Sequence, residues 1–387
     1  MNKFGKLVVG AIFFSLAVSP FHMEAQSKPR ARDLGVPFEG TTGKFNAITD
    51  VAGVEVGYTT LISGEGKAAI RTGVTAIFPL GKDYAQPVFA GWHTLNGNGE
   101  MTGTTWIEES GAFGGPVVIT NTHSVGVVRD AVIEWGTKRS SRKGYSGDYS
   151  LPVVAETWDG FLNDINGFHV KREHVFAALD AAKSGPVAEG NVGGGTGMMA
   201  HQFKGGTGTS SRVLTQDQGG STVGVLVQAN YGGRSQLRVA GAPVGREIPD
   251  LMPSEGAPSP DSGSIIVAIA TDAPLLPHQL RRIVKRASLG IGLMGGIGGN
   301  SSGDIFVAFS TANKQAAAKL DGVAKLEMLP NERINAVFAA VVQATEEAIV
   351  NALVAAETMK GVNGNTAYAI PHDRLRAALK KYNRSNN

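Results

Sequence analysis

The residues Gly263-Ser-Ile-Ile-Val-Ala-Ile-Ala270 change from loop to strand composition within two positions. The preceding segment, 241–263, contains five of the 17 prolines and has almost no periodic pattern, which is typical of a linker or an exposed loop. The Val/Ile-rich run that follows predicts a fully buried strand. Ser264 therefore stands at the junction between a loop segment and the core.

Working outward from this strand, short β-branched runs broken by glycine recur along the first third of the chain. Helical spacing of apolar residues comes mainly later, and glycine-rich stretches occupy 190–208 and 290–303. A chain that combines both kinds of element predicts a layered α/β sandwich rather than a bundle or a barrel. The expected strands are 53–58, 72–78, 115–120, 223–230, 264–270 and 305–309, and the expected helices are 172–184, 277–288 and 331–360.

Composition excludes several classes of protein. Of the 387 residues, 42% are hydrophobic and 18% are charged, so the bulk of the chain is not intrinsically disordered. The absence of cysteine excludes disulfides, thiolate metal sites and a cysteine nucleophile. A net charge of +3 without a basic block argues against a nucleic-acid-binding protein.

The N-terminus is typical of a targeting segment. Lys3 and Lys6 precede an apolar run over 7–19, which is shorter than the roughly 20 residues that span a bilayer. These features predict a signal peptide over 1–25 with cleavage after Ala25, against the alternatives of an uncleaved anchor or a buried helix. No later stretch reads as a membrane span, so we expect an exported, soluble protein, periplasmic in a Gram-negative source.

Two motifs match known signatures in the wrong context. Gly195-Thr-Gly-Met-Met-Ala200 fits the dinucleotide pattern G-x-G-x-x-A, but loop residues precede it where a strand is required. Gly299-Asn-Ser-Ser-Gly303 fits the hydrolase elbow G-x-S-x-G, but it leads into a strand rather than a helix. The eight histidines show no metal-binding spacing, and we expect His169 and His174 to be surface or satisfied core residues.

The Gly263–Ser264 junction supports two interpretations. A Gly-Ser pair ahead of a strand is usually only a turn. If the chain were cut there, however, Ser264 would carry both a hydroxyl nucleophile and a free amine with a pKa of about 8. That amine could act as the adjacent base that a hydroxyl needs. Gly263 would tolerate the strained backbone required for Ser264 to attack the preceding carbonyl group.

Several motifs, in order along the mature chain, resemble the DmpA/β-peptidyl aminopeptidase family of self-processing N-terminal serine aminopeptidases. They cover nearly all of the mature chain, and as a set they are more specific than any one of them. The matching segments are 151–160 (LPVVAETWDG), 193–198 (GGGTGM), 203–212 (FKGGTGTSSR), 225–232 (VLVQANYG), 263–267 (GSIIV), 270–275 (ATDAPL), 302–306 (SGDIF) and 346–353 (EEAIVNAL).

This resemblance implies a four-layer αββα sandwich that forms a single domain and cuts itself between Gly263 and Ser264. Residues 26–263 would then be the large subunit and residues 264–387 the small subunit. The two chains would remain together and assemble into homo-oligomers of several αβ pairs. Neither a metal nor an organic cofactor is implied, and the expected partners are small substrates rather than nucleic acid or membrane.

The resemblance also implies the catalytic residues. Ser264 is similar to the nucleophile, Ser302 and Asp304 to the hydroxyl and carboxylate that support it, and Asn230 to the oxyanion-hole amide. One preorganised amide donor can lower such a barrier by roughly 3–4 kcal/mol.

Two further residues are expected to bind the substrate. Glu156 is similar to the carboxylate that holds the free ammonium group, which it would do through a charge-assisted hydrogen bond. Trp158, two residues later, is expected to form a wall of the specificity pocket.

The predicted activity is removal of N-terminal residues from short peptides, amides and esters through an acyl-enzyme on Ser264, with β-amino acids slightly favoured. One alternative is the L-aminopeptidase and D-amidase/esterase activity of the same family. A second is a non-catalytic secreted binding protein that keeps the fold. A third is an acyltransferase that uses the same nucleophile.

Overall fold

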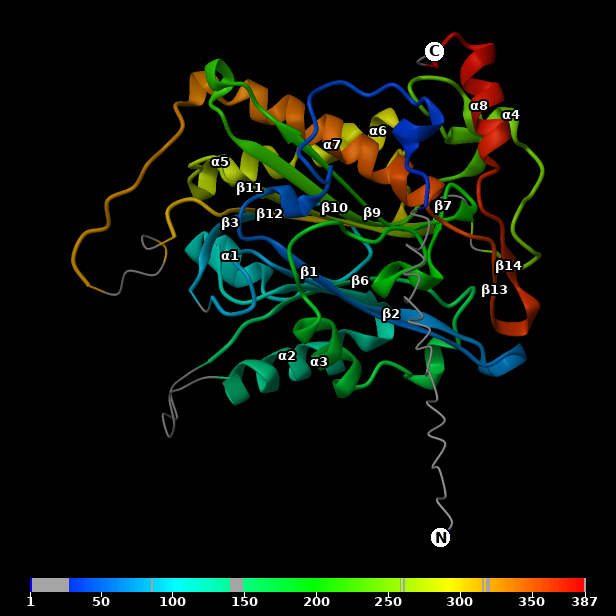
Figure 1. Ribbon diagram of the computed structural model, residues 1–387, viewed down its shortest axis with the longest axis horizontal. Coiled ribbons are helices and arrows are strands. Elements are labelled where there is room, and N and C mark those ends of the chain that lie inside the picture. The colour runs from blue at the N-terminus through cyan, green and yellow to red at the C-terminus, as the bar shows by residue number, and fades with distance from the viewer. Residues whose placement is uncertain are drawn as a thin grey trace.

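The computed structural model describes residues 1, 28–84, 86–139, 149–257, 259, 262–314, 317 and 321–385 (Figure 1). Apart from Met1, the predicted signal peptide lies outside the described residues, as do residues 258, 260 and 261 of the proline-rich segment.

Two β-sheets form the centre of the molecule. The strands of the first sheet, in spatial order, are β1 (Glu55–Ser63), β2 (Ile70–Phe78), β5 (Val117–Asn121) and β6 (Val153–Thr157). Those of the second are β4 (Ala112–Phe113), β3 (Val88–Gly97), β12 (Ser301–Ser310), β11 (Ser262–Thr271), β10 (Thr222–Asn230) and β9 (Gly206–Val213). The pairs β5–β6 and β11–β12 are parallel, and the other pairs in these two sheets are antiparallel.

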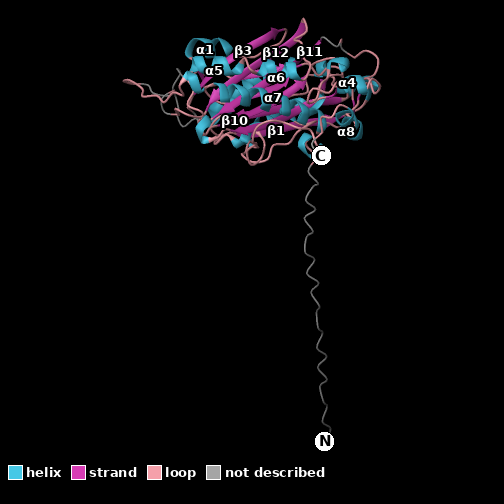
Figure 2. Cartoon of the chain, turned by 90° about the horizontal axis from the view of Figure 1, so that it is seen from above, coloured by secondary structure: helices cyan, strands magenta, loops and turns pink. Residues whose placement is uncertain are grey.

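Helices cover the outer face of each sheet (Figure 1). The four-stranded sheet is covered by α2 (Val125–Arg139) and α3 (Arg172–Asp180). The six-stranded sheet is covered by α5 (Pro277–Val284), α6 (Ala287–Leu293) and α7 (Asn335–Val354), which lie over it in Figure 2. The remaining elements are α1 (Thr104–Ser110), α4 (Val244–Glu247), α8 (His372–Lys381) and two small hairpins, β7 (Met199–Ala200) with β8 (Phe203–Lys204) and β13 (Met359–Lys360) with β14 (Thr366–Ala367).

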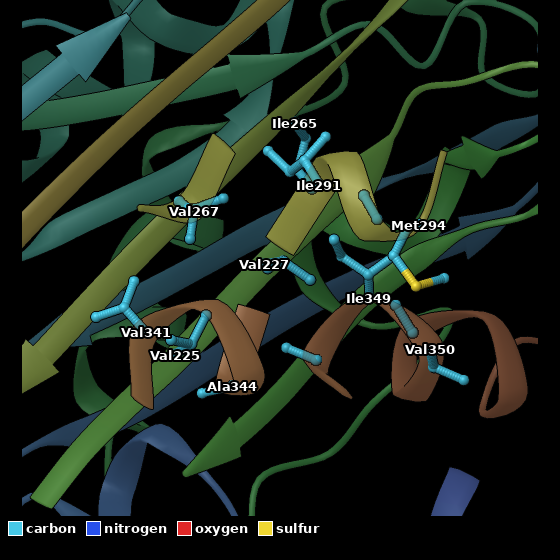
Figure 3. Packing of buried hydrophobic residues seen from close by; sticks show 14 of the residues in the cluster. Val225, Val227, Ile265, Val267, Ile291, Met294, Val341, Ala344, Ile349 and Val350 are labelled. Atoms are coloured by element: carbon cyan, nitrogen blue, oxygen red, sulfur yellow. The ribbon is translucent and has the colours of Figure 1, made fainter. Parts of the chain in front are cut away.

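Three apolar layers hold this arrangement together. One lies between the sheets, and the other two lie between each sheet and its helices. Strand β11 separates two of them, because its side chains alternate between the faces of the sheet. Ile265 and Val267 pack toward α6 and α7 (Figure 3), whereas Ile266 and Ala268 pack toward the other sheet. The predicted four-layer αββα sandwich is therefore confirmed.

Helix α7 is a core helix with the composition of a membrane span. Its mean hydropathy is 1.5 over 18 residues. The expectation that no later stretch is long and apolar enough to span a bilayer was therefore wrong, as far as length and composition alone are concerned. Most of the helix is buried, where it packs on β9, β10 and α6. An apolar core helix passes the same test, so the finding is weak evidence for a membrane span.

Several predicted boundaries were wrong. The helix expected over 331–360 covers only Asn335–Val354. The helix expected over 277–288 is two helices, and the second, Ala287–Leu293, extends into the stretch predicted as a glycine-rich turn. The predictions also left the residues of β3 and α2 unassigned.

Candidate active site

A cavity of about 450 Å³ opens where β5, β6 and β10 end and where β11 and β12 begin. It brings together Glu156, Trp158, Asn230, Gly263 and Ser264, five of the seven residues predicted for the site. Its other lining residues are Asn98, Gly99, Glu100, Thr122, Phe161, Gly197, Met199, Gln202, Tyr231, Gly232, Ser259 and Ser301.

Ser264 lies at the head of β11 and is 5% exposed. It is opposite Asn230 on β10 and beside Gly303 on β12, whose N–H donates to Ser264 Oγ at 3.2 Å. Alternation along β11 turns its side chain toward the other sheet, as for Ile266. The hydroxyl therefore faces the cavity rather than the helices.

Gly263 has a backbone conformation that strongly favours glycine. Its φ is +135°, and a Cβ there would lie 3.0 Å from Tyr231 Cα and collide with the Asn230 carbonyl oxygen. Positive φ and a close backbone approach both require the absence of a side chain. The backbone ahead of Ser264 is therefore one that glycine adopts readily and that a residue with a side chain could not.

Ser302 and Asp304 form a hydrogen-bonded pair on the opposite face of the same sheet. Ser302 Oγ donates to Asp304 Oδ1 at 2.6 Å, and both residues are buried. They share the helix-facing side of β12 with Phe306. The main-chain nitrogen of Ser264 lies in the plane of the sheet between the two faces. The pair therefore lies on the face of the sheet away from the Ser264 hydroxyl, where Asp304 accepts a hydrogen bond from the N–H of Ile265, the residue after Ser264.

The charge state of this pair depends on Asp304. Burial raises the pKa of its carboxyl group, although hydrogen bonds from Ser302 and from the Ile265 N–H act in the opposite direction. A carboxylate with a raised pKa is a better proton acceptor than an ordinary aspartate.

Asn230 is held at both ends of its amide group. Oδ1 accepts a hydrogen bond from the Met199 N–H at 2.8 Å, and Nδ2 donates to the Trp158 carbonyl oxygen at 2.9 Å. These bonds fix the amide plane at the wall of the cavity, opposite Ser264. The second Nδ2 hydrogen remains available to an oxyanion formed there.

Glu156 is a buried carboxylate at the end of β6. Its Oε1 accepts a hydrogen bond from the Glu100 N–H at 3.0 Å, and its Oε2 accepts one from the Thr122 hydroxyl. Burial raises its pKa, against the effect of these two donors. Trp158, which is 40% exposed, lines the same cavity. An anionic group beside an aromatic wall suits a substrate with an ammonium group.

Sequence reasoning missed three contacts of the site. Thr122 and Glu100 orient Glu156, and the Gly303 N–H contacts the Ser264 hydroxyl. Thr122 follows β5, which runs parallel to β6, so both strands end at the same edge. Only this strand pairing could have pointed to Thr122, and the pairing is known only once the fold is known. The Glu100 and Gly303 contacts come from main-chain groups, for which sequence gives no signal.

The motifs set aside in the sequence have structural roles. Gly193–Gly197 is a buried 3₁₀ helix beneath the cavity rather than a phosphate-binding loop. His169 pairs with Asp164 at 2.9 Å, and His174 accepts the Lys171 N–H, as expected for satisfied residues. In the part of the chain that the structure describes, no three His, Asp or Glu side chains cluster as metal ligands would.

A serine at the head of a core strand in an αββα sandwich is the arrangement of the N-terminal-nucleophile hydrolases. Two solved structures of aminopeptidases have a similar fold. The L-aminopeptidase D-Ala-esterase/amidase from Ochrobactrum anthropi, described as a variant of that fold, is 51% identical, with a TM-score of 0.87 over 93% of this chain and all of that one. A β-aminopeptidase from Burkholderia sp. is also 51% identical, with a TM-score of 0.84 over 91% of this chain and 99% of that one.

The chain belongs to peptidase family S58, whose model matches residues 46–367. It is 56% identical to the β-peptidyl aminopeptidase BapA of Sphingosinicella microcystinivorans, over 99% of this chain and 98% of that protein. It is 51% identical to BapA of Sphingosinicella xenopeptidilytica, over 95% and 94% of the two chains. The predicted family and enzyme class, a hydrolase of the aminopeptidase type, are confirmed.

Proposed function

We propose that this protein cuts itself before Ser264 and then removes N-terminal residues, preferably β-amino acids, from short peptides, amides and esters. The observation that carries the proposal is the shared cavity. It contains the Ser264 hydroxyl, the Asn230 amide and the Glu156 carboxylate, each of which has a distinct chemical task. The comparisons favour this enzyme over the non-catalytic binding protein.

Maturation begins at the Gly263–Ser264 bond. Ser264 Oγ attacks the Gly263 carbonyl carbon and loses its proton, the C–N bond breaks, and the nitrogen takes up a proton as the amine. Water then hydrolyses the resulting ester, which releases the Gly263 carboxylate and restores the hydroxyl. Glycine adopts the positive φ of Gly263 readily, so the chain can hold a backbone conformation here that a residue with a side chain could not.

Turnover uses the same hydroxyl on a substrate. The substrate ammonium binds to Glu156, and Ser264 Oγ attacks the carbonyl carbon while the free amine of Ser264 accepts its proton. The Asn230 amide stabilises the oxyanion, and the proton passes to the leaving group. Water then hydrolyses the acyl-enzyme. Ser302 and Asp304 stabilise the protonated amine from the other face of the sheet.

The test is the variant Ser264→Ala. Intact-mass spectrometry of the wild-type protein under denaturing conditions should give two chains, one that begins at Ser264 and has 387 − 263 = 124 residues. The variant should remain a single chain without aminopeptidase activity. Ser288→Ala is the control, because Ser288 lies on α6 and does not line the cavity. Normal turnover by Ser264→Ala would refute the assignment.

The preference for β-amino acids rests on the relatives and on the cavity. Both curated relatives are named β-peptidyl aminopeptidases, whereas one similar structure is an L-aminopeptidase. Trp158 lines the cavity two residues after Glu156, and its wall shapes the space for the residue that is released. The test compares the rates of hydrolysis of β-alanyl and L-alanyl anilides. Faster release of L-alanine would favour the L-aminopeptidase and D-amidase/esterase activity.

We also propose that the protein is exported. The proposal rests on Lys3, Lys6 and the apolar run over 7–19. N-terminal sequencing of the large subunit from its native cell should give a sequence that begins after Ala25, and a subunit that begins at Met1 would contradict a cleaved signal peptide. Assembly of several αβ pairs, which the resemblance implies, stays a prediction.

A further inference from the structure

Tyr231 is a buried tyrosine whose hydroxyl has no task in the mechanism above. It follows Asn230 at the end of β10, so its side chain points to the opposite face of the sheet, toward the helices. The residue is 4% exposed, and its ring packs edge-on against His201 with centroids 4.9 Å apart. Within the described residues, the Tyr231 hydroxyl has no hydrogen-bond partner.

A second, small cavity lies on this face of the sheet. Its volume is about 10 Å³, and Tyr231, Ser302 and Asp304 line it together. The rest of its wall is formed by Gly232, Gln236 and the loop residues Ile297, Gly298 and Gly299. The supporting pair of the proposed mechanism thus borders the same space as the unused phenol.

The second carboxylate oxygen of Asp304, Oδ2, lies close to this space. Oδ1 is occupied by the Ser302 hydroxyl. A Cβ at Gly298, which lines the cavity, would lie 3.7 Å from Oδ2. The Asn96 side-chain amide donates to the Gly298 carbonyl oxygen at 3.2 Å and so holds this loop. The unpaired Tyr231 hydroxyl and the Asp304 carboxylate therefore border the same small cavity.

The size of the cavity fits one small ligand. A volume of roughly 10–15 Å³ on this measure holds a single water molecule, which needs two to four polar partners. The phenol, the Asp304 carboxylate and the Ser302 hydroxyl supply them. Burial and, to a smaller extent, the negative charge of Asp304 raise the pKa of Tyr231 well above its usual value. The phenol therefore remains protonated and can donate a hydrogen bond.

We propose that this cavity binds one water molecule that links the Tyr231 hydroxyl to Asp304 Oδ2, which makes Tyr231 a positioning residue for the Ser302–Asp304 pair. The inference rests on the proposed function. The water-mediated link holds the Asp304 carboxylate in the orientation in which it accepts the hydrogen bond from the Ser302 hydroxyl. It also favours the charged form of Asp304, because the water donates to that oxygen.

The test combines two substitutions in a double-mutant cycle. Tyr231→Phe removes only the hydroxyl, and it should lower kcat by about tenfold or more, since hydrogen bonds to charged groups are the strong ones. KM should change less than kcat, because Tyr231, although it borders the substrate cavity, has no part in the proposed binding of the substrate ammonium group by Glu156. The acidic limb of the kcat profile should move to higher pH as Asp304 loses a donor. In an Asp304→Asn background, Tyr231→Phe should have little further effect.

Several other groups also affect the pKa of Asp304 and hence the pH dependence of kcat. In the uncut chain they are the Ser302 hydroxyl, the Ile265 N–H and the Tyr231 phenol, and the Ser264 amine joins them after cleavage. The matched control is Tyr58→Phe, since the Tyr58 hydroxyl donates to the Ala188 carbonyl oxygen outside both cavities. That variant should keep the wild-type kcat and pH profile.

Phenylalanine fills the space of the Tyr231 ring and leaves no protein partner unpaired, so the variant should fold, which near-ultraviolet circular dichroism checks. Wild-type kcat and pH dependence in Tyr231→Phe would overturn the inference. A full additional loss in the Asp304→Asn background would overturn it as well. Both results leave the proposed function intact, which fails instead if the wild-type protein neither cuts itself nor releases N-terminal residues.

Discussion

At the scale of single residues, Gly263 combines two requirements that no other amino acid meets. Its φ is +135°, and a Cβ there would collide with the Asn230 carbonyl oxygen, so a side chain would displace the backbone at the bond that we propose is cut. Gly263→Ala should slow self-cleavage by about 100-fold, because misplacement of reacting groups by about 1 Å costs that much. The uncut fraction on a denaturing gel over time measures the effect.

Gly241→Ala is the matched control for this variant. Gly241 also has a positive φ, +80°, but a Cβ there would meet no atom within 4 Å. Gly241→Ala therefore introduces a side chain at an unfavourable positive φ but causes no steric clash. Gly241 also lies outside the cavity. Cleavage of Gly263→Ala at the wild-type rate would show that the chain can adopt the reactive geometry with a side chain at that position.

Glu156 should control how substrate binding depends on pH. Burial raises the pKa of Glu156, so its carboxylate is neutralised at a higher pH than that of an exposed glutamate. The neutral form attracts an ammonium group less, and KM should therefore rise as pH falls through that raised pKa. Glu156→Gln should raise KM by about tenfold at neutral pH and remove this acidic rise.

Steady-state kinetics from pH 5 to 8 measures both effects. Glu65→Gln is the control, because Glu65 is exposed and does not line the cavity. The neighbours that act on Glu156 are Thr122, Glu100 and His123, and all three remain in the variant. An unchanged KM and pH profile in Glu156→Gln would move the ammonium site elsewhere.

The site was only partly predictable from these residues. Gly263 and Ser264 stand out because composition changes sharply around them, and a glycine ahead of a buried strand suggests a special backbone conformation. Asn230 and Glu156 came from the resemblance, since neither residue type is unusual at a strand end. Thr122 and Tyr231 were missed because their importance depends on strand pairing and on the face of the sheet that each occupies.

At the scale of elements, glycine explains why β9 was missed. Residues 190–208 were expected to be a glycine-rich stretch, yet β9 begins at Gly206 and forms the edge of the six-stranded sheet. A Cβ at Gly208 would collide with the Ala348 carbonyl oxygen of α7. Here glycine permits a helix to lie directly on a strand, and sequence cannot distinguish that use from a turn.

The same helix carries a buried charge whose removal should be costly. Glu347 on α7 is fully buried and pairs with Arg212 on β9 at 2.8 Å and with Arg32 at 2.7 Å. Glu347→Gln leaves Arg212 buried without its counter-charge. We expect the free energy of unfolding to fall by about 3–5 kcal/mol at pH 7. Urea unfolding measures the change.

The pH dependence of this loss follows from Glu347. Burial alone would raise its pKa, but the hydrogen bond from Arg32 and the charge of Arg212 hold it below its usual value. The stabilisation is therefore present above the unfolded-state pKa of about 4.3 and disappears as pH falls through the lower folded-state pKa. The difference between wild-type and Glu347→Gln stability should narrow in acid.

Glu247→Gln is the control for an exposed pair. Glu247 accepts from Lys381 at the surface, where water screens the interaction, so its loss should change stability little. Equal effects of the two substitutions, or a Glu347→Gln penalty that persists unchanged in acid, would contradict the argument.

At the scale of the whole molecule, the proposed cut divides the sequence but not the fold. Residues 264–387 supply β11 and β12, which lie between β10 and β3 of the preceding segment in one sheet. Helix α7 packs on β9 and β10, and Ile265 and Val267 share an apolar cluster with Val225 and Val227 (Figure 3). Neither chain could bury its apolar surface alone.

The two chains should therefore stay together until the whole fold unfolds. The mature protein should elute as one native species and separate into two chains only in denaturant. Unfolding of the cut protein releases two chains, so by mass action its urea midpoint should rise with protein concentration more steeply than that of uncut Ser264→Ala. Equal concentration dependence, or a small chain that elutes alone under native conditions, would show that residues 264–387 fold independently. That outcome would contradict the strand order, since β11 and β12 would have to leave the middle of the sheet without unfolding it.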